Sequence, residues 1–401
     1  MTAKLYHQNG CTQCEATVLD CRANADGTFD ILLDRTAIYP EGGGQLSETG
    51  YIGPARCTHA RDDGGEIWHR CDKPIEIGQS VHVAADEAVR LDHTQQHTGE
   101  HMLSGLAHSM FGCTNVGFHM ANDIVTVDFD KPLSAEQIAE LELKVNEAIQ
   151  RDEPTRTVTV TPEEYETIEI RKKAKGLKGE ITVVYAGGVD SCTCCGTHCQ
   201  SAGQVGVLKI LSHMNYKGGV RIGFVCGMRA VLSMQRDSAR MDAIARRFST
   251  SADKAVDAVI KQGDELAAMR REFKQRTDML LDYRAKELAE KAELCGKTRA
   301  VVTMEEGLEA NELGFLCEKL CACGNMVAVV LAQKGENLSY RVARSADVAL
   351  SMRELIQAVN ALFGGKVFWW DYSSQGSAKL NGSAKDSVEQ LKAYVYRRIK
   401  G

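Results

Sequence analysis

The chain of 401 residues lacks long hydrophobic runs and any excess of positive charge. No stretch of 18 or more apolar residues occurs, which argues against a membrane-spanning helix. The first residues contain no apolar segment of the secretory type, so we expect a cytoplasmic protein. The formal net charge of −6 argues against broad, non-specific binding of nucleic acid, although it allows a local basic patch.

Disulfide bonds are not expected, although the chain has 15 cysteines. In a secreted protein this number would suggest a disulfide framework, whereas in a cytoplasmic chain of this length it indicates free thiols and leaves room for one metal site. Most cysteines, such as Cys57 and Cys226, stand singly and are typical of small buried hydrophobic residues. Cys11 and Cys14 form a C-x-x-C pair, which we interpret as two thiols because no partner pair has matching spacing.

The pattern of hydrophobic residues predicts an α+β protein of four parts. Residues 1–90 alternate short strand-like runs with turns, which is typical of a small N-terminal β-barrel. Residues 91–230 combine a helix over about residues 92–112 with a capped helix that begins after Ser134 and with several strand-like runs, and they predict an α+β core. Residues 296–401 alternate strands and helices and predict a small α/β domain.

Residues 231–295 connect these last two parts and predict a helical or coiled-coil linker. Proline is absent from residues 231–293, and the sequence is rich in charged residues and alanine. Four apolar residues repeat every seven positions, namely Val259, Leu266, Phe273 and Leu280. This pattern suggests a homodimer surface, but Arg276 would fall in the apolar seam, which argues against a long, perfect zipper.

Two short segments far apart in the chain carry the residues of a metal site. His97 and His101 are four positions apart, so on a helix they share one face, one turn apart. Cys194 and His198 form a C-x3-H pair in the turn that follows a strand-like run. A set of three imidazoles and one thiolate favours a borderline divalent ion, most of all zinc, and tunes such an ion for catalysis as well as for structure.

Spacing alone leaves the ligand set open. His93 lies four positions before His97 and competes with His101 as the second histidine of the pair. Three further cysteines compete with Cys194 as the thiolate ligand, namely Cys192, Cys195 and Cys199. His101 and Cys194 are 93 positions apart, and nothing in the spacing shows that they meet.

Several motifs resemble those of one family in the same order. Residues 97–103, His-Thr-Gly-Glu-His-Met-Leu, resemble the H-T-A-x-H-L-L element of alanyl-tRNA synthetase editing domains and of the freestanding AlaX editing proteins. Residues 194–198 are similar to the C-G-G-T-H element of that family, and residues 201–210 to T-G-x-I-G-x-x-K-I. Residues 39–45 resemble F-Y-P-x-G-G-G-Q, and residues 117–119 resemble S-F-H.

The resemblance implies a set of site residues. By it, the zinc ligands are His97, His101, Cys194 and His198. Gln45 is implied as a catalytic residue that orients water or substrate, and Gly43 and Gly44 as a loop whose backbone closes on the aminoacyl-adenosine. Thr98 is implied near the hydroxyl of a bound serine.

The linker and residues 296–401 resemble the long AlaX form, which ends in a DHH-associated C-terminal domain. That domain usually carries a G-G-x-G-G-G stretch, whereas here Gly364-Gly365-Lys366 is followed by Val-Phe-Trp-Trp at residues 367–370. This departure puts binding of the tRNA elbow in doubt. A second departure is Cys195, which stands where the family has glycine.

The implied activity is hydrolysis of tRNA(Ala) mischarged with serine or glycine. The aminoacylation pocket of a synthetase that accepts alanine rejects these amino acids poorly, so a second site that hydrolyses the wrong ester is needed. We expect no aminoacylation core in this chain, because residues 1–90 already match the start of the editing unit. A basic run that includes Lys172, Lys173 and Lys175 is a candidate contact for tRNA phosphates.

Two other classes of function stay open at this point. The first is a non-catalytic RNA-binding module in which zinc is structural, because four protein ligands leave no open position on a tetrahedral ion. The second is a zinc hydrolase that acts on another aminoacyl-tRNA.

Overall fold

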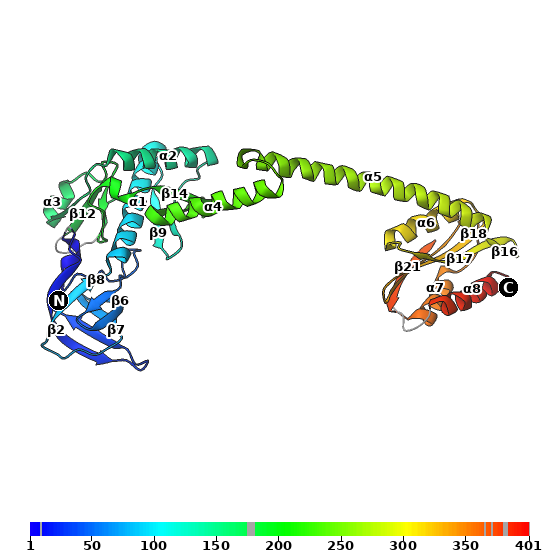
Figure 1. Cartoon of the computed structure of the whole chain (residues 1–401), viewed down its shortest axis with the longest axis horizontal. Coiled ribbons are helices and arrows are strands. Elements are labelled where there is room, and N and C mark those ends of the chain that lie inside the picture. The colour runs from blue at the N-terminus through cyan, green and yellow to red at the C-terminus, as the bar shows by residue number, and fades with distance from the viewer. Residues whose placement is uncertain (9, 175–180, 365, 370–371, 380–383, 401) are drawn as a thin grey trace. The chain divides into compact units, whose positions relative to one another are not determined.

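The computed structural model describes residues 1–8, 10–174, 181–364, 366–369, 372–379 and 384–400 (Figure 1). The chain divides into two compact units, Met1–Ile244 and Ala245–Gly401. The finer division into four parts stays a prediction. No helix among the described residues is both long and apolar enough to cross a membrane.

The first unit begins with a closed β-barrel, which confirms the predicted N-terminal barrel. Its interior is filled by buried aliphatic side chains such as Ile31, Leu33, Ile52 and Val83. Outside it, β1 (Ala3–Lys4) pairs with β4 (Arg35–Thr36) and leads into the short helix η1 (Leu5–His7). The six barrel strands, in order around the barrel, are β2 (Gln13–Ala23), β3 (Phe29–Leu33), β7 (Glu66–Cys71), β6 (Ala55–Asp63), β5 (Gly50–Ile52) and β8 (Ser80–Ala85).

The helix α1 (Glu87–Phe111) follows the barrel and runs through the core of the first unit. It begins earlier than the predicted residue 92 because Asp86 caps it, accepting a hydrogen bond from the backbone N–H of Ala88. It ends where Gly112 takes a left-handed conformation, with φ of 63°. Fourteen of its residues are buried, so both faces of this helix pack against protein.

Two sheets and two helices complete this core. The four-stranded sheet has the order β14 (Leu208–Tyr216), β15 (Gly219–Cys226), β10 (Val125–Phe129) and β9 (Asn115–Met120). The three-stranded sheet has the order β11 (Arg156–Val160), β12 (Ile181–Ala186) and β13 (Asp190–Thr193). The predicted capping box is confirmed at α2 (Ala135–Arg151), where Ser134 and Gln137 bond each other's backbone N–H groups. The shorter elements are α3 (Pro162–Thr167) and η2 (Ala202–Val205).

Glycines let α1 approach its neighbours closely. A Cβ atom added at Gly105 would lie 2.3 Å from the carbonyl oxygen of Val189, at the turn between β12 and β13. A Cβ atom added at Gly99 would lie 2.2 Å from Sγ of Cys226, at the end of β15. Neither position tolerates a side chain without movement, so α1 is held tightly against both sheets.

The linker region is helical, as predicted. The helix α4 (Gly227–Arg247) ends close to the boundary between the two units, and η3 (Ala252–Lys254) leads into α5 (Ala255–Glu290), a single helix of 36 residues. The four apolar residues of the seven-residue repeat are all exposed on α5, by 45% to 71% (Val259, Leu266, Phe273 and Leu280).

The second unit is a six-stranded mixed sheet covered on both faces. Leu281, Ala285 and Leu288 of α5 pack with α6 (Ala310–Ala322) against one face. The helices α7 (Met352–Phe363) and α8 (Ala384–Lys400) pack against the other. The strand order is β16 (Glu293–Cys295), β17 (Thr298–Glu306), β18 (Met326–Lys334), β19 (Asn337–Arg344), β21 (Ser373–Lys379) and β20 (Lys366–Trp369). The predicted C-terminal domain of strands and helices is confirmed, but its sheet also includes β16, β20 and β21, which were not predicted.

Candidate metal centre

The structure brings together the four donors that the resemblance implied. His97 and His101 project from the same side of α1, and Cys194 and His198 lie in the segment between β13 and η2. Their candidate ligand atoms all lie within 4.8 Å of one another. Sγ of Cys194 is 3.4 Å from Nε2 of His97 and 3.4 Å from Nε2 of His198.

These separations fit a tetrahedral ion. Bond lengths of about 2.0–2.1 Å from zinc to nitrogen and about 2.3 Å to sulfur give tetrahedral ligand–ligand distances of roughly 3.4–3.7 Å. The two sulfur–nitrogen distances of 3.4 Å agree with this spacing. Since three imidazoles and one thiol converge on one point, the chemistry of the donor set suits a borderline divalent cation.

The second ring nitrogen of each histidine faces a polar partner. Nδ1 of His97 is 2.8 Å from Oε1 of Gln45, and Nδ1 of His101 is 2.9 Å from the carboxylate of Asp190. Nδ1 of His198 is 3.4 Å from the hydroxyl oxygen of Thr98. Acceptors at these positions fix the proton on Nδ1 and leave Nε2 free to bind a metal, which is the usual outer support of metal-binding histidines.

Asp190 is a site residue that the sequence did not reveal. It is buried at the start of β13, and its carboxylate accepts two hydrogen bonds from Arg171, at 2.5 and 2.9 Å. Burial alone would raise the pKa of Asp190, but the bonds from Arg171 and His101 outweigh it and hold the pKa below its usual range. Arg171 was part of the basic run in the sequence, and nothing there pointed to a buried partner.

The electrostatics prepare the thiol and the imidazoles for a cation. Burial opposes ionisation of Cys194, but the three neighbouring imidazoles hold its pKa well below the usual value of a thiol. Burial lowers the pKa of His198 to about 4, so this ring stays neutral. Burial opposes charge on His101 too, but Cys192, Cys194 and the bond to Asp190 raise its pKa well above the usual value, so a metal would have to displace a proton from this ring. A thiolate and neutral imidazoles are the forms that bind metals.

The glycine loop packs against the metal centre. Gly42 and Gln45 pair in a tight turn, with φ of 59° at Gly43 and 85° at Gly44. A Cβ atom at Gly44 would lie 2.5 Å from the ring of Phe118, whereas one at Gly43 would meet nothing within 4 Å. Phe118 in turn stacks on His97, with ring centroids 5.1 Å apart. Gly43 therefore faces open space, and Gly44 serves the close packing of the loop.

Gln45 sits behind the histidine rather than in the cavity. Its side chain is 1% exposed, its Oε1 also accepts a hydrogen bond from the backbone N–H of Thr197 at 3.1 Å, and its Nε2 donates to the Thr197 hydroxyl at 2.9 Å. A Cβ atom at Gly196 would lie 2.1 Å from the His97 ring, so this glycine lets the loop cross directly over the pair. Both amide atoms of Gln45 are therefore hydrogen-bonded within the protein.

A buried ion pair ties the glycine loop to α1. The guanidinium of Arg90 bonds both carboxylate oxygens of Glu48, and it also donates to the carbonyl of Ala37 at 2.7 Å. Glu48 accepts a hydrogen bond from the backbone N–H of Tyr39, at the start of the glycine loop. The pair lies two helical turns before His97, so it fixes the loop against the same helix that carries the histidines.

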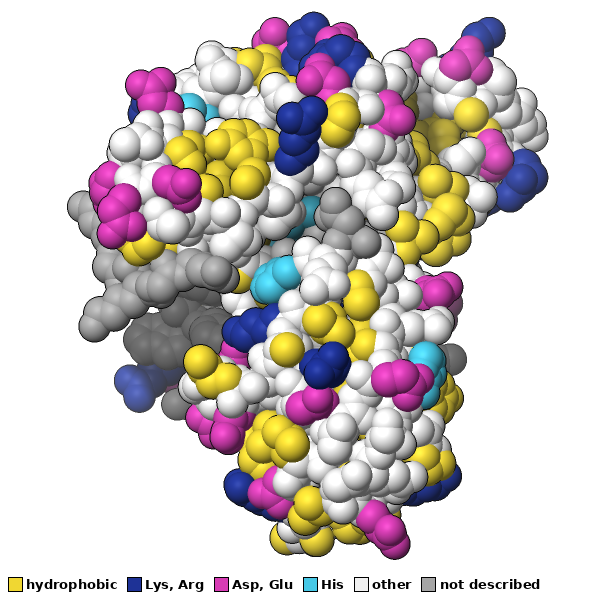
Figure 2. All heavy atoms as spheres, turned by 90° about the vertical axis from the view of Figure 1, so that its left-hand side faces the viewer, with side chains coloured by type: hydrophobic (Ala, Val, Ile, Leu, Met, Phe, Trp, Pro, Cys, Tyr) yellow, Lys and Arg dark blue, Asp and Glu magenta, His cyan; other side chains and the backbone are white. Residues whose placement is uncertain are grey.

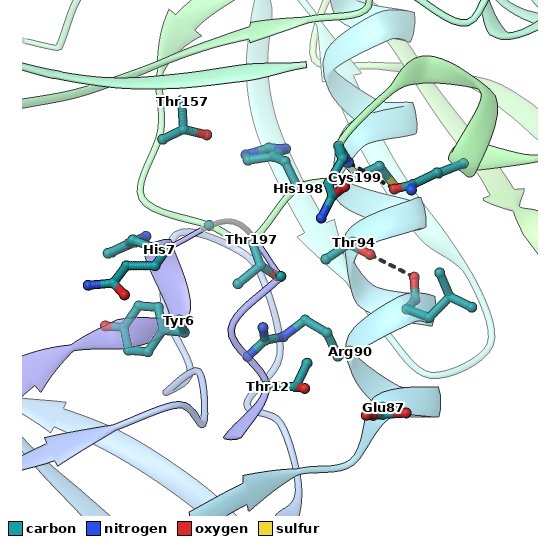
Figure 3. Close-up of a pocket in the computed structure, with 16 residues that line it drawn as sticks. Tyr6, His7, Thr12, Glu87, Arg90, Thr94, Thr157, Thr197, His198 and Cys199 are labelled. Carbon is teal, nitrogen blue, oxygen red and sulfur yellow. Dashed lines mark hydrogen bonds between the residues drawn. The ribbon is translucent and has the colours of Figure 1, made fainter. Parts of the chain in front are cut away.

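A polar cavity opens beside the centre (Figure 3). His198 and Thr197 form one wall, Arg90 and Thr94 of α1 another, and Tyr6 and His7 of η1 lie opposite. An adjoining hollow contains Gly42, Gly43 and Cys195 of the two site loops, and it shares Tyr6, His7, Gln8 and Thr157 with the first. A ligand in these hollows would lie between the glycine loop and the metal ligands.

Comparison with known proteins agrees with this site. The family described as Threonyl and Alanyl tRNA synthetase second additional domain matches residues 181–222, which include Cys194 and His198. The alanyl-tRNA editing protein AlaX-L of Pyrococcus horikoshii is 26% identical over 98% of this chain and over its own whole length. The chain is a homologue of the alanyl-tRNA editing proteins, in their long form.

Two further relatives match in part. Alanyl-tRNA editing protein Aarsd1 of Rattus norvegicus is 31% identical over 58% of this chain, which spans only 58% of that protein. The alanine–tRNA ligase of Ignicoccus hospitalis is 26% identical over 91% of this chain, which spans 40% of the ligase.

Two competing ligands, His93 and Cys192, do not belong to the four-donor group of this editing-protein homologue. His93 is buried, and its Nδ1 has no hydrogen-bond partner among the described residues. Cys192 approaches the outer nitrogen of His101, with Sγ 3.5 Å from Nδ1, and so could group with Asp190 as a second set. Because Arg171 already bonds both oxygens of Asp190, we assign that set to the support of His101.

The remaining cysteines do not extend the centre. The backbone N–H of Cys199 donates to the hydroxyl of Thr98, and the residue is buried. Cys195 is exposed in the hollow next to Cys194. Cys11 and Cys14 belong to no group of three or more potential ligands within the described part of the chain.

The predicted tRNA contacts have partners within the chain. Nζ of Lys172 donates to the carbonyl of Asn115 at 2.9 Å, and Nζ of Lys173 donates to that of Glu166 at 2.8 Å. Both residues are exposed, and each ammonium keeps donors for a further partner. Lys175 lies outside the described residues. On the face shown in Figure 2, Lys and Arg side chains are scattered among acidic ones rather than gathered in one broad patch.

Proposed function

We propose that this chain is a zinc-dependent trans-editing hydrolase that deacylates mischarged tRNA(Ala), with Ser-tRNA(Ala) as the main substrate and Gly-tRNA(Ala) as a second one. The observation that carries the proposal is the convergence of His97, His101, Cys194 and His198 in a homologue of alanyl-tRNA editing proteins. The reaction is cleavage of the ester between the amino acid carboxyl and the terminal ribose.

Zinc is the ion that best suits the four donors. His97, His101, Cys194 and His198 would hold it, since a thiolate and three neutral imidazoles match its preference for sulfur and nitrogen ligands. When bound, zinc supplies a Lewis acid beside the cavity, available to ester, amine or water groups of the reaction.

In this proposal, Gln45 and Asp190 act through the metal ligands. Gln45 holds the His97 ring and the Thr197 backbone, and Asp190 holds the His101 ring. Both are therefore positioning residues, and the role first expected for Gln45, direct contact with water or substrate, gives way to this one. Thr98 is 0% exposed and binds the backbone of Cys199, so we also propose that it supports the His198 loop.

The substrate end of tRNA would occupy the cavity beside His198. Its walls carry many hydroxyl and amide groups, including Thr94, Thr157 and Gln204, which suit a ribose and a small polar amino acid. Gly43 offers an open backbone on the adjoining side, and we place it, with Gly44 packed behind it, at the aminoacyl-adenosine. Lys172, Lys173 and Lys175 would meet tRNA phosphates.

We propose a cytoplasmic location and a homodimer as parts of the same account. Every cysteine is free, as is usual in a reducing compartment such as the cytoplasm. The exposed seven-residue repeat on α5 gives a second copy of the chain an apolar surface. Sedimentation of the full chain, compared with a Leu266→Glu and Phe273→Glu double variant, tests the dimer. A monomeric wild-type protein would contradict it.

The test of function is release of serine from Ser-tRNA(Ala), with Ala-tRNA(Ala) as the control substrate. The wild-type protein should release serine and spare alanine. Cys194→Ala should lose activity because it removes a metal ligand, and Cys323→Ala, which removes an exposed thiol of the second unit, should retain it.

The other outcomes distinguish the alternatives. Binding of tRNA by folded, metal-loaded protein without cleavage of either ester would support a non-catalytic RNA-binding module instead. Cleavage restricted to a different aminoacyl-tRNA would keep the hydrolase and overturn the substrate.

A further inference from the structure

The second unit contains a cavity of its own, between α6 and one half of the sheet. It is lined on the helix side by small residues of α6 together with Phe315, and on the sheet side by polar residues of β19 and β21. The lining on the two sides includes Ala310, Gly314, Cys317, Arg341, Ser373 and Gln375. This cavity lies within the second unit and shares no residue with the metal centre.

The polar lining departs from the pattern of the rest of the sheet. On the face that α6 covers, the buried residues of β17 and β18 are apolar, for example Val301, Ala328 and Val330. The same face continues on β19 and β21 with Arg341, directly opposite Gln375, and with Ala343, opposite Ser373. A sheet covered on both faces is normally apolar on both, so this polar stretch is a departure. Within it, Nη1 of Arg341 donates to Oε1 of Gln375 at 2.6 Å.

The helix leaves space above these polar residues. Ala310, Gly314, Cys317 and Cys321 recur at intervals of three and four, so they form one stripe of small residues along α6. A Cβ atom at Gly314 would lie 3.7 Å from the guanidinium carbon of Arg341. The glycine therefore leaves room for the guanidinium close beneath the helix, and the small side chains of the stripe leave the adjoining cavity open.

Two residues that line the cavity have polar atoms without partners. Oγ of Ser373 and Nε of Arg344 are buried and have no hydrogen-bond partner among the described residues. Buried polar groups are almost always paired in folded proteins, so two unpaired atoms on residues that line one cavity mark it as a place where an added group could complete the hydrogen bonding after a small side-chain rotation.

The charges and rings define the class of ligand. Two guanidinium groups line the cavity, against the single carboxylate of Glu318, and guanidinium groups bind phosphate well. Each donates to an uncharged group of the protein, Nη1 of Arg341 to the Gln375 amide and Nη1 of Arg344 to a backbone carbonyl. The guanidinium of Arg344 lies over the ring of Tyr372, 4.8 Å from its centroid, and that ring is 56% exposed. An exposed aromatic ring beside a phosphate-binding group suits a nucleobase.

We propose that this cavity is a second ligand site, which binds the phosphate of a small nucleotide, with Ser373, Arg341 and Arg344 at the phosphate and Tyr372 at the base. The site is independent of the editing activity proposed above. If this cavity binds no nucleotide, the proposed editing activity is unaffected. If the editing activity is absent, the proposed nucleotide site is unaffected.

The test is calorimetric titration of the full, metal-loaded chain with adenosine 5′-monophosphate, inorganic phosphate and adenosine. The nucleotide should bind, phosphate should compete with it, and adenosine alone should bind at least about tenfold more weakly. Gly314→Leu fills the cavity and should weaken nucleotide binding at least about tenfold. Ser373→Ala should weaken it about threefold.

A matched control separates blocked binding from loss of fold. Gly263→Leu makes the same change in α5, at a position where a Cβ atom meets nothing within 4 Å, and should bind like the wild type. Unchanged binding in Gly314→Leu would overturn the proposal, because the nucleotide would then be bound elsewhere, for example beside the metal centre. No binding of nucleotide or phosphate by the folded wild-type chain would also overturn it. If a short single-stranded RNA alone binds, and does so in a Gly314-dependent way, the small nucleotide is the wrong ligand.

Discussion

The metal centre and the cavity of the second unit differ in how completely their buried polar atoms are hydrogen-bonded. Around the metal ligands, each outer histidine nitrogen has a partner, and the partner of His101 is itself held by Arg171. In the second cavity, Ser373 and Arg344 have buried atoms without partners among the described residues. A network that is complete within the protein holds its ligands in one geometry, whereas an incomplete one depends on an added group to complete it.

The largest effect should come from breaking the complete network at Asp190. In Asp190→Asn the charge that supports His101 is lost and buried Arg171 keeps only a neutral partner, so zinc affinity should fall about 100-fold, equal to about 2.7 kcal/mol. Competition with a chelator measures this affinity. Asp128→Asn is a matched control, because Asp128 also bonds an arginine twice but lies away from the metal centre. Equal affinity in both variants would contradict the role of Asp190.

The close packing of α1 should be the next most sensitive feature. Gly99→Ala places a Cβ atom 2.2 Å from Sγ of Cys226 and should destabilise the protein by about 2 kcal/mol. Adding Cys226→Ala removes the sulfur and leaves the nearest Cys226 atom, its Cβ, at 3.6 Å, so the double variant should regain most of the loss. Denaturant unfolding measures both. If Cys226→Ala lowers the stability of the Gly99→Ala variant further, a clash between the new methyl group and the sulfur is not the cause of the destabilisation.

Removing the amide of Gln45 should have a smaller effect. Gln45→Ala leaves the His97 ring without its acceptor, and we expect zinc binding to weaken about tenfold, or about 1.4 kcal/mol. Serine release at saturating zinc should then largely recover, because Gln45 acts through His97. Loss of turnover that zinc does not restore would instead place the amide at the substrate, as the sequence first suggested.

The smallest effect should be that of a partly exposed ion pair. Asp128 bonds Arg221 across β10 and β15, and this hydrogen bonding, opposed by slight burial, lowers the pKa of Asp128. A lowered pKa means that the pair stabilises the fold above the unfolded pKa of about 3.9 and loses this contribution as the pH falls further. Asp128→Asn should cost about 0.5–1 kcal/mol at pH 7 and progressively less below pH 4. A cost that persists at pH 2 would exclude the charge as its source.

The sequence predicted local features well, but it predicted contacts between residues far apart in the chain poorly. The pairing of His97 with His101 follows from the helical period, and the capping box of α2 follows from Ser134 and Gln137. The meeting of His101 with Cys194 depends on tertiary structure, and only the family resemblance suggested it. The helices and the three longest strands of the C-terminal unit could be predicted because their hydrophobic patterns are regular, whereas β16, β20 and β21 were not predicted.

Other parts could not be predicted because the partner residues are distant in sequence. Asp190 bonds His101 across 89 positions, and Gln45 bonds His97 across 52. A glutamine after three glycines, or an arginine in a basic run, gives no sign of such partners. Nothing in the sequence indicated that the ring of Phe118, from β9, packs beside Gly44.

Metal removal tests the central claim most directly. The purified chain should contain one zinc ion, should lose serine release from Ser-tRNA(Ala) after chelation, and should regain it when zinc is restored. His101→Ala should stay folded yet neither hold zinc at the wild-type level nor release serine. Full serine release by the metal-free protein would contradict the account, because the four donors would then be unnecessary for ester cleavage.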